Sequence, residues 1–204
     1  VYSPKHNVFK VLEDFGEVWE LEKNAFKPYA CGIVLHPSID ACIQLSEVAL
    51  PEEVDKIILQ VNPYVLELTG KKEPKTGLEG KFSIYHTGAM AFLERDASED
   101  QYQDEKVLAS KTIAFREKIK PVANEKVDKD KVEAILVKKD GTSHKVSIEH
   151  ATGSIENPMT KAMLERKFKK LCKSSLTDEK ITQLIESIYQ FEQMEFESLI
   201  NIFN

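Results

Sequence analysis

The chain contains little cysteine: three residues in 204, namely Cys31, Cys42 and Cys172, and none in CxxC spacing. An odd count without that spacing argues against a disulfide framework and a structural zinc site, and it favours a reducing compartment. The sequence also lacks any apolar run near the roughly 20 residues of a membrane span. No apolar stretch of signal-peptide type follows Val1. We therefore expect a cytoplasmic protein with no membrane partner.

Basic segments are absent as well. Lys and Arg total 28 against 34 Asp and Glu, which leaves a net charge of −6. Nucleic-acid binding needs a concentrated basic surface, so we expect no nucleic-acid partner. What the chain does have is 42% hydrophobic and 30% charged residues, a composition typical of a globular protein that buries a real core.

Several motifs for cofactor chemistry are missing. The sequence has no G-x-G-x-x-G, no GK[ST], no HExxH and no G-x-S-x-G, which disfavours Rossmann cofactors, P-loop phosphate chemistry, zinc proteolysis and a serine nucleophile elbow. No dense cluster of cysteines or carboxylates is present to hold an iron–sulfur centre. We predict neither a metal site nor an organic cofactor.

Periodicity and turn signals predict an α+β fold. Asp140-Gly141 between two strand-like runs is a strong hairpin signal, and Val54 to Val61 reads as a further strand. Apolar residues at helical spacing predict helices on both sides of these strands. The predicted helices cover 37–48, 82–93, 107–115, 159–172 and 177–188. Because strands and helices are segregated, we predict a small antiparallel sheet with helices rather than a doubly wound fold.

Chemistry, if present, must come from scattered titratable residues. Tyr85 and His86 follow the glycine-containing stretch before Lys81 and open an apolar helix, where polar side chains often line a cleft. The alternative is a buried tyrosine whose hydroxyl caps a backbone group. His36 precedes Pro37 at a helix start, where it is either a packing residue or a functional one.

Two further residues carry the same ambiguity. Lys27 is a candidate for binding an anion, although most lysines are solvated surface charges. Asp40 lies four residues after His36 on the same helical face, where it either orients the imidazole or forms an ordinary helix pair. The residues by themselves therefore indicate a possible Lys, His and Tyr site and name no reaction.

Longer stretches of sequence carry a resemblance. They run, in order, through Phe26–Gly32, His36–Ala41, Leu68–Pro74, Thr76–His86, Asp140-Gly141, His150-Ala151, Gly153-Ser154 and Asn157–Thr160. Together they resemble the MmgE/PrpD family, which includes 2-methylcitrate dehydratases, cis-aconitate decarboxylase and an iminodisuccinate epimerase. The resemblance covers essentially the whole chain.

The resemblance implies a domain organisation. Family members are about twice this length, with a large helical domain and an inserted α+β lid. It assigns residues 1–36 to the lead-in of the helical domain, 37–156 to the lid and 157–204 to C-terminal helices of the otherwise missing helical domain. Since the chain also begins with Val, we expect a fragment or one polypeptide of a split enzyme.

The resemblance also implies roles for individual residues. Lys27 matches the family lysine that binds a substrate carboxylate, with Lys81 and His86 completing the predicted substrate-binding set. Tyr85 matches the lid tyrosine that reaches the active site. These residues and His36, whose role is unassigned, are the predicted catalytic and binding groups. Gly32 stands where the decarboxylase branch has a histidine, which favours dehydration or epimerisation over decarboxylation.

Two hypotheses for function follow. The first is that the chain is a fragment or subunit of a cofactor-independent lyase or isomerase acting on small di- or tricarboxylates, similar to 2-methylcitrate dehydratase. The isolated chain is then expected to be inactive. The second is a non-catalytic lid domain that dimerises or binds a partner chain. The apolar stripes of the two terminal helices predict self-association or a partner that supplies the N-terminal helical half.

Overall fold

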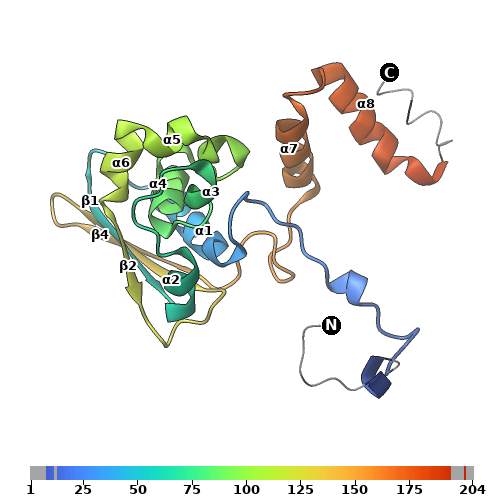
Figure 1. The fold of residues 1–204 in the computed structure, drawn as a ribbon, viewed down its shortest axis with the longest axis horizontal. Coiled ribbons are helices and arrows are strands. Elements are labelled where there is room, and N and C mark those ends of the chain that lie inside the picture. Colours follow the sequence, from blue (N-terminus) through green and yellow to red (C-terminus); the bar gives the residue numbers. More distant parts are fainter. Residues whose placement is uncertain (1–7, 12, 194–199, 201–204) are drawn as a thin grey trace.

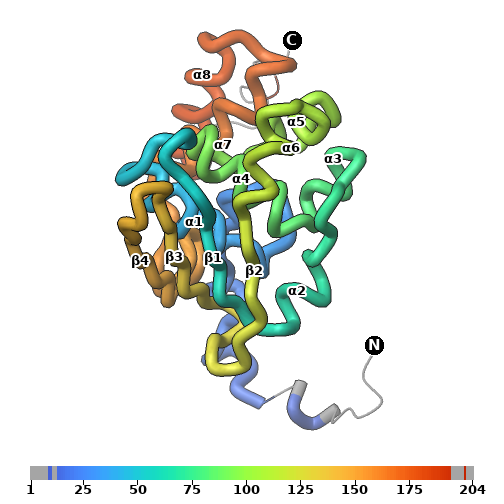
Figure 2. Tube along the Cα trace, turned by 90° about the vertical axis from the view of Figure 1, so that its left-hand side faces the viewer, coloured from blue at the N-terminus to red at the C-terminus, as the bar shows by residue number. Residues whose placement is uncertain are grey.

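The computed structural model describes residues 8–11, 13–193 and 200. Its body has two layers, a four-stranded sheet and a set of helices that cover one face of it (Figures 1 and 2). The strands are β1 Val54–Val61, β2 Ile119–Ala123, β3 Val132–Lys138 and β4 Ser143–Ile148, in the order β2-β1-β3-β4. The α+β class predicted from the sequence is confirmed.

The sheet is mixed rather than purely antiparallel. Strand β2 pairs in parallel with β1, with Ile57 opposite Ile119, whereas β3 is antiparallel to both β1 and β4. Residues 62–118 form a helical crossover between β1 and β2, and such a connection returns the chain in the same direction. The sequence analysis missed β2, which is short and contains Pro121; proline is tolerated there because β2 is an edge strand.

The predicted hairpin and the first predicted strand are both present. The turn between β3 and β4 places Gly141 at φ 88°, a conformation that glycine adopts without a steric penalty. The Asp140 carboxylate accepts hydrogen bonds from the backbone and hydroxyl of Thr142, at 2.9 and 2.7 Å. The turn chemistry therefore determines the hairpin locally.

Most helices follow the predicted ranges. The segment 107–115 differs, because the backbone is extended at Ala109 and divides it into two short helices. The helix predicted to reach residue 48 ends at Leu45. The helices are α1 His36–Leu45, α2 Pro63–Thr69, α3 Gly77–Gly80, α4 Ile84–Glu94, α5 Asp104–Leu108, α6 Ser110–Arg116, α7 Lys161–Cys172 and α8 Asp178–Tyr189.

The core lies between the helices and the sheet. Helices α1 and α4 pack on each other, α1 lies against β3 and β4, and α4 lies against β2. Small residues of α4 permit this approach; a Cβ on Gly88 would lie 3.5 Å from Ile119. Large apolar side chains without solvent exposure fill the space, including Leu35, Ile39, Leu45, Ile57, Leu59, Ile84 and Leu136.

Two segments project from this body. Helices α7 and α8 pack on each other and extend to one side, and residues 13–26 extend in another direction (Figures 1 and 2). Both terminal helices occur where the sequence predicted them. The predicted domain boundaries stay a prediction, and part of the ranges 1–36 and 157–204 lies outside the described residues. No helix in the described parts of the chain is long and apolar enough to cross a membrane.

Candidate functional site

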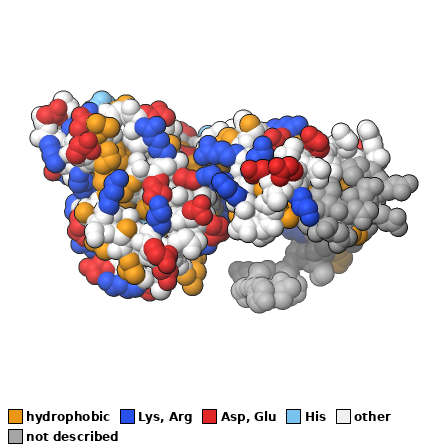
Figure 3. Space-filling model, turned by 90° about the horizontal axis from the view of Figure 1, so that it is seen from above, with side chains coloured by type: hydrophobic (Ala, Val, Ile, Leu, Met, Phe, Trp, Pro, Cys, Tyr) orange, Lys and Arg blue, Asp and Glu red, His pale blue; other side chains and the backbone are white. Residues whose placement is uncertain are grey.

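A groove of about 780 Å³ lies where α7 meets the body. Its walls come from residues 27–32, from the segment around Lys81 and Phe82, from residues 95–100 after α4, and from α7. Figure 3 shows basic side chains gathered near this junction. Segments distant in the sequence therefore form one concave surface.

The groove is positively charged. Six basic residues and three acidic ones line it, an excess of three positive charges. The basic residues are Lys27, Lys81, Arg95, Arg166, Lys167 and Lys170, and the acidic ones are Asp96, Glu99 and Asp100. A partly enclosed surface with one dominant sign of charge concentrates counter-ions, so the groove is suited to an anion.

Some of these cations already have acidic partners. The Lys81 Nζ lies 2.6 Å from a Glu99 carboxylate oxygen, and Lys170 forms an ion pair with Asp96. Within the described residues, neither Lys27 nor Arg166 has an ion-pair partner. Arg95 and Lys167 also lack an ion-pair partner there, but each donates to a backbone carbonyl. Lys27 and Arg166 are therefore the groove cations for which the described residues provide neither an ion pair nor a side-chain hydrogen bond.

Helix α7 is held at the groove by its lysines. Besides the Lys170 ion pair with Asp96, Lys167 donates a hydrogen bond from Nζ to the Lys27 backbone carbonyl. The helix begins at a Thr160 cap whose hydroxyl accepts from the Met163 amide. These contacts bring the α7 cations beside Lys27.

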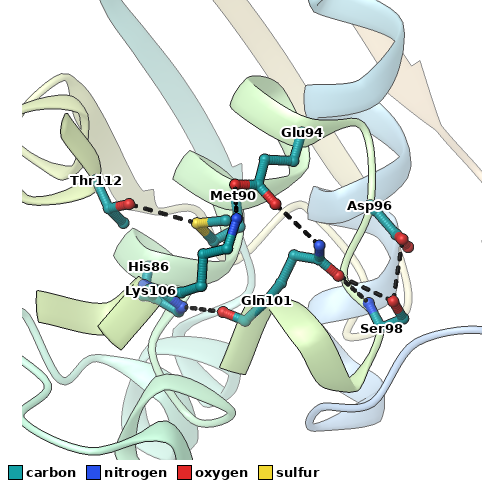
Figure 4. A network of polar contacts seen from close by, with 8 residues as sticks. All are labelled: His86, Met90, Glu94, Asp96, Ser98, Gln101, Lys106 and Thr112. Carbon is teal, nitrogen blue, oxygen red and sulfur yellow. Dashed lines mark hydrogen bonds and ion pairs between the residues drawn. The ribbon is translucent and has the colours of Figure 1, made fainter. Parts of the chain in front are cut away.

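A polar network fixes the wall that follows α4 (Figure 4). The Gln101 side chain donates to Glu94 and accepts from the Ser98 amide, and the single hydroxyl proton of Ser98 lies within reach of both the Gln101 amide oxygen and the Asp96 carboxylate. Before this wall, Arg95 adopts a left-handed conformation at φ 54° and donates to the Ser46 carbonyl at 2.9 Å. The Asp96 carboxylate is thereby held in place to receive Lys170.

His86 belongs to this network and lies outside the groove lining. It has no solvent exposure, and its Nε2 lies 2.9 Å from the Gln101 carbonyl. Burial lowers the pKa of His86 to about 4, so the ring is neutral near pH 7 and donates from Nε2. The structure therefore places this predicted substrate-binding residue behind the groove wall, where it supports residues 96–101.

His36 lies outside the lining as well. It is 3% exposed, its Nε2 is buried without a hydrogen-bond partner, and its ring contacts the Tyr29 ring edge-to-face at 5.2 Å. Burial, together with the charges of Lys27 and Lys167, lowers the pKa of His36 to about 4. The histidine is neutral near pH 7, and its ring lies against Tyr29, which lines the groove.

Tyr85 does not join the groove cations. It lies in the first turn of α4, half-buried, and packs against the hydrophobic core. Of the five predicted site residues, the structure brings Lys27 and Lys81 together in the groove and leaves Tyr85, His36 and His86 outside its lining. The roles predicted for all five stay predictions.

Tyr29 and Cys31 line the groove beside Lys27. The Tyr29 hydroxyl donates to Asp40 at 2.5 Å, and burial together with that carboxylate raises the pKa of Tyr29. Burial raises the pKa of Cys31 to about 11, so its thiol is protonated near pH 7 and is a poor nucleophile.

Sequence reasoning missed the cations of α7. Arg166 and Lys170 are four residues apart and share one side of the helix, away from the apolar positions 164, 168 and 171. That spacing was a usable signal. What the sequence did not show is which element this side would face.

No metal-ligand cluster is evident in the described ranges 8–11, 13–193 and 200, where no three His, Cys, Asp or Glu side chains are arranged to hold a metal ion. The predicted independence from a cofactor stays a prediction. No contact among the described residues tests the acid–base chemistry that the resemblance implies.

Comparison with protein families now adds to this geometry. Residues 29–190 match the model of the MmgE/PrpD C-terminal domain. The chain belongs to the MmgE/PrpD family. The match spans the body and all of α7 and α8, and it begins two residues after Lys27. A search of curated proteins finds no match. The predicted family is thus confirmed at the level of its C-terminal domain. The groove described above is the strongest candidate site of this MmgE/PrpD domain.

Proposed function

We propose that this MmgE/PrpD domain binds a small di- or tricarboxylate in the groove and serves a cofactor-independent lyase or isomerase similar to 2-methylcitrate dehydratase. The observation that carries the proposal is the pair of available cations, Lys27 and Arg166, on two of the segments that line a groove with an excess of positive charge. Two cations on two walls suit a ligand with two or more carboxylates. Guanidinium groups are well matched to carboxylates because they can donate two parallel hydrogen bonds.

The chemistry of such a site is proton transfer next to a carboxylate. Cations that hold the carboxylate stabilise negative charge that develops on the adjacent carbon. Lys27 and Arg166 are assigned this electrostatic role. Lys81 is a further contact for a ligand carboxylate, which would replace Glu99 as its ion-pair partner. Because Gly32 replaces the histidine of the decarboxylase branch, dehydration or epimerisation is the proposed reaction.

Among the described residues that line the groove, no histidine or tyrosine is both exposed and suited to proton transfer. His36 and His86 are buried outside the lining, and the Tyr29 hydroxyl is bonded to Asp40. We therefore expect the 204-residue chain to bind citrate, 2-methylcitrate and cis-aconitate without turnover. EDTA and anaerobic handling should leave any activity seen with a partner chain unchanged.

Calorimetric titration with citrate tests the binding. The expected result is binding that weakens as the ionic strength rises and that falls roughly tenfold in Lys27→Ala or Arg166→Gln, since each change removes a charged hydrogen-bond donor. Lys139→Ala, on the hairpin turn far along the chain from the groove, is the matched control and should bind as the wild type does. Equal citrate affinity in all four proteins, or no binding to the wild type, would refute the proposal.

A second candidate is a dimerising module, favoured by the apolar face of α7 and α8. Phe26, Leu164, Phe168, Leu171, Ile185, Ile188 and Tyr189 line a groove of about 380 Å³ there, and several of them are exposed. The occupant we propose is the N-terminal segment 13–25 of a second copy. This segment carries five acidic residues and one lysine, α7 carries five basic residues and one glutamate, and Trp19 and Leu21 are exposed.

The compartment is also a proposal. All three cysteines are free, and Cys31 and Cys42 are buried, as expected of thiols that pack as small apolar side chains in a reducing environment. We propose the cytoplasm. Localisation of a tagged full-length gene product tests this.

A further inference from the structure

Asp40 is a buried carboxylate that joins two distant segments. It lies on α1 and is 7% exposed, and no Lys or Arg of the described residues forms an ion pair with it. Its Oδ1 accepts from the Tyr29 hydroxyl at 2.5 Å, and its Oδ2 accepts from the Thr152 amide at 2.6 Å. Both carboxylate oxygens are thus used by neutral donors, one 11 and the other 112 residues away in sequence.

The two joined segments lead to the two cationic walls of the groove. Tyr29 lines the groove two residues after Lys27. Thr152 lies in the connection from β4 to α7, and α7 supplies Arg166. The Asp40 carboxylate therefore joins the segment that carries Lys27 to the segment that leads into α7.

Direct backbone packing beside Asp40 reinforces this junction. Gly153 follows Thr152 at φ 89°, and a Cβ there would lie 2.1 Å from the Phe26 carbonyl oxygen and 2.7 Å from the Pro28 Cδ. The Gly153 amide donates to the Asn157 carbonyl at 2.8 Å, which turns the chain toward α7. A shift of either segment must therefore disturb the other.

We propose that Asp40 is a positioning residue that sets the separation between Lys27 and Arg166 in the groove. The inference rests on the proposed function for its effect on ligand affinity, whereas the separation itself can be measured without a ligand. Asp40 is absent from the groove lining, so it acts through Tyr29 and Thr152 and does not touch the ligand.

Asp40→Asn is the main test variant. Asparagine keeps the shape but offers one acceptor oxygen, and its amide would face one of the two donors, so one hydrogen bond is lost. Tyr29→Phe removes only the hydroxyl and breaks one bond from the other side. Thr69→Val is the matched control, because it removes a buried hydroxyl that donates to Val65 within α2 at 2.6 Å, away from the groove.

The position of α7 is read by electron spin resonance. One spin label is attached to Cys172 at the end of α7, and the other to a cysteine introduced by Lys139→Cys on the hairpin turn. Cys31 and Cys42 are buried and should remain unlabelled. Citrate affinity of each protein is measured in parallel by calorimetry.

The expected result is a broader or displaced distance distribution in Asp40→Asn and Tyr29→Phe, with citrate affinity weakened roughly tenfold, and neither change in Thr69→Val. Unchanged distances in folded Asp40→Asn would overturn the inference. If citrate fails to bind the wild type, the proposed function fails, and the distances still decide whether Asp40 positions α7. If Asp40→Asn does not fold, Tyr29→Phe decides in its place.

Discussion

At the scale of single residues, burial keeps two histidines neutral. His36 and His86 are almost completely removed from water, and burial lowers the pKa of each to about 4. Because burial disfavours the charged imidazole, each ring stays neutral and packs as a polar part of the core. Exposed groove cations, Lys27 and Arg166 among them, are then the groups available to meet a ligand.

Stability should fall as the pH is lowered from about 6.5 to 4. In this window the unfolded chain binds protons on both histidines and the native state does not, so the free energy of unfolding decreases toward acid. The expected loss is at most about 3 kcal/mol for each imidazole. Urea unfolding at several pH values measures it.

His86→Gln identifies the residue responsible. It should be less stable at pH 7, because it disturbs the contact with the Gln101 carbonyl, and its unfolding free energy should depend less steeply on pH than that of the wild type. The slope that remains includes the contribution of His36. A slope in His86→Gln equal to that of the wild type would contradict the assignment.

At the scale of elements, two glycines share one backbone conformation and differ in their neighbours. Gly141 in the β3–β4 turn and Gly153 after β4 have φ 88° and 89°. Nothing lies within 4 Å of a Cβ on Gly141, whereas a Cβ on Gly153 would lie 2.1 Å from the Phe26 carbonyl oxygen. The first glycine satisfies a turn, and the second permits two segments to touch.

The pair Gly141→Ala and Gly153→Ala separates these two requirements. Gly141→Ala should lower the free energy of unfolding by about 1 kcal/mol, the usual cost of a left-handed alanine. Gly153→Ala should cost several times more, because the backbone must also move. Urea denaturation compares them, and equal losses would show that the contact with Phe26 yields without strain.

At the scale of the whole molecule, the terminal helices leave apolar surface exposed. Helix α8 buries Ile181 and Leu184, while Ile188 and Tyr189 are about half exposed. Contiguous apolar patches of this kind on a soluble domain usually mark an interface. The acidic segment 13–25 of a second copy has the charge and the side chains to cover it.

Self-association should therefore occur at micromolar concentration. Burial of each large apolar side chain contributes roughly 1.5–3 kcal/mol, so Ile188→Asp and Trp19→Ser should each shift the protein toward monomer, and high salt should weaken the charged part of the contact. Leu50→Asp, at an exposed position of the body, is the control. Sedimentation velocity measures the change; a wild type that stays monomeric on concentration would contradict the arm-to-helix contact.

Local chemistry was sufficient for much of the fold. The Asp140-Gly141 turn and the helical spacing of apolar residues in α7 and α8 act over a few residues, so the sequence predicted these elements. The departures include the parallel pairing of β2 with β1, which makes the sheet mixed, and the division of the helix predicted over 107–115. Strand β2 exists because β1 offers it an edge, and Ala109 breaks a helix that periodicity alone would continue.

The sequence by itself determined the family, the α+β class and the candidacy of Lys27 and Lys81, because each follows from residue type and order. The tertiary structure decided which candidates share a surface. Only packing could place Arg166 in the same groove as Lys27, bury His36 and His86 outside the lining, and join Asp40 to Thr152 across 112 residues. Contacts between distant segments depend on how whole layers pack, and no short-range preference in the chain encodes them.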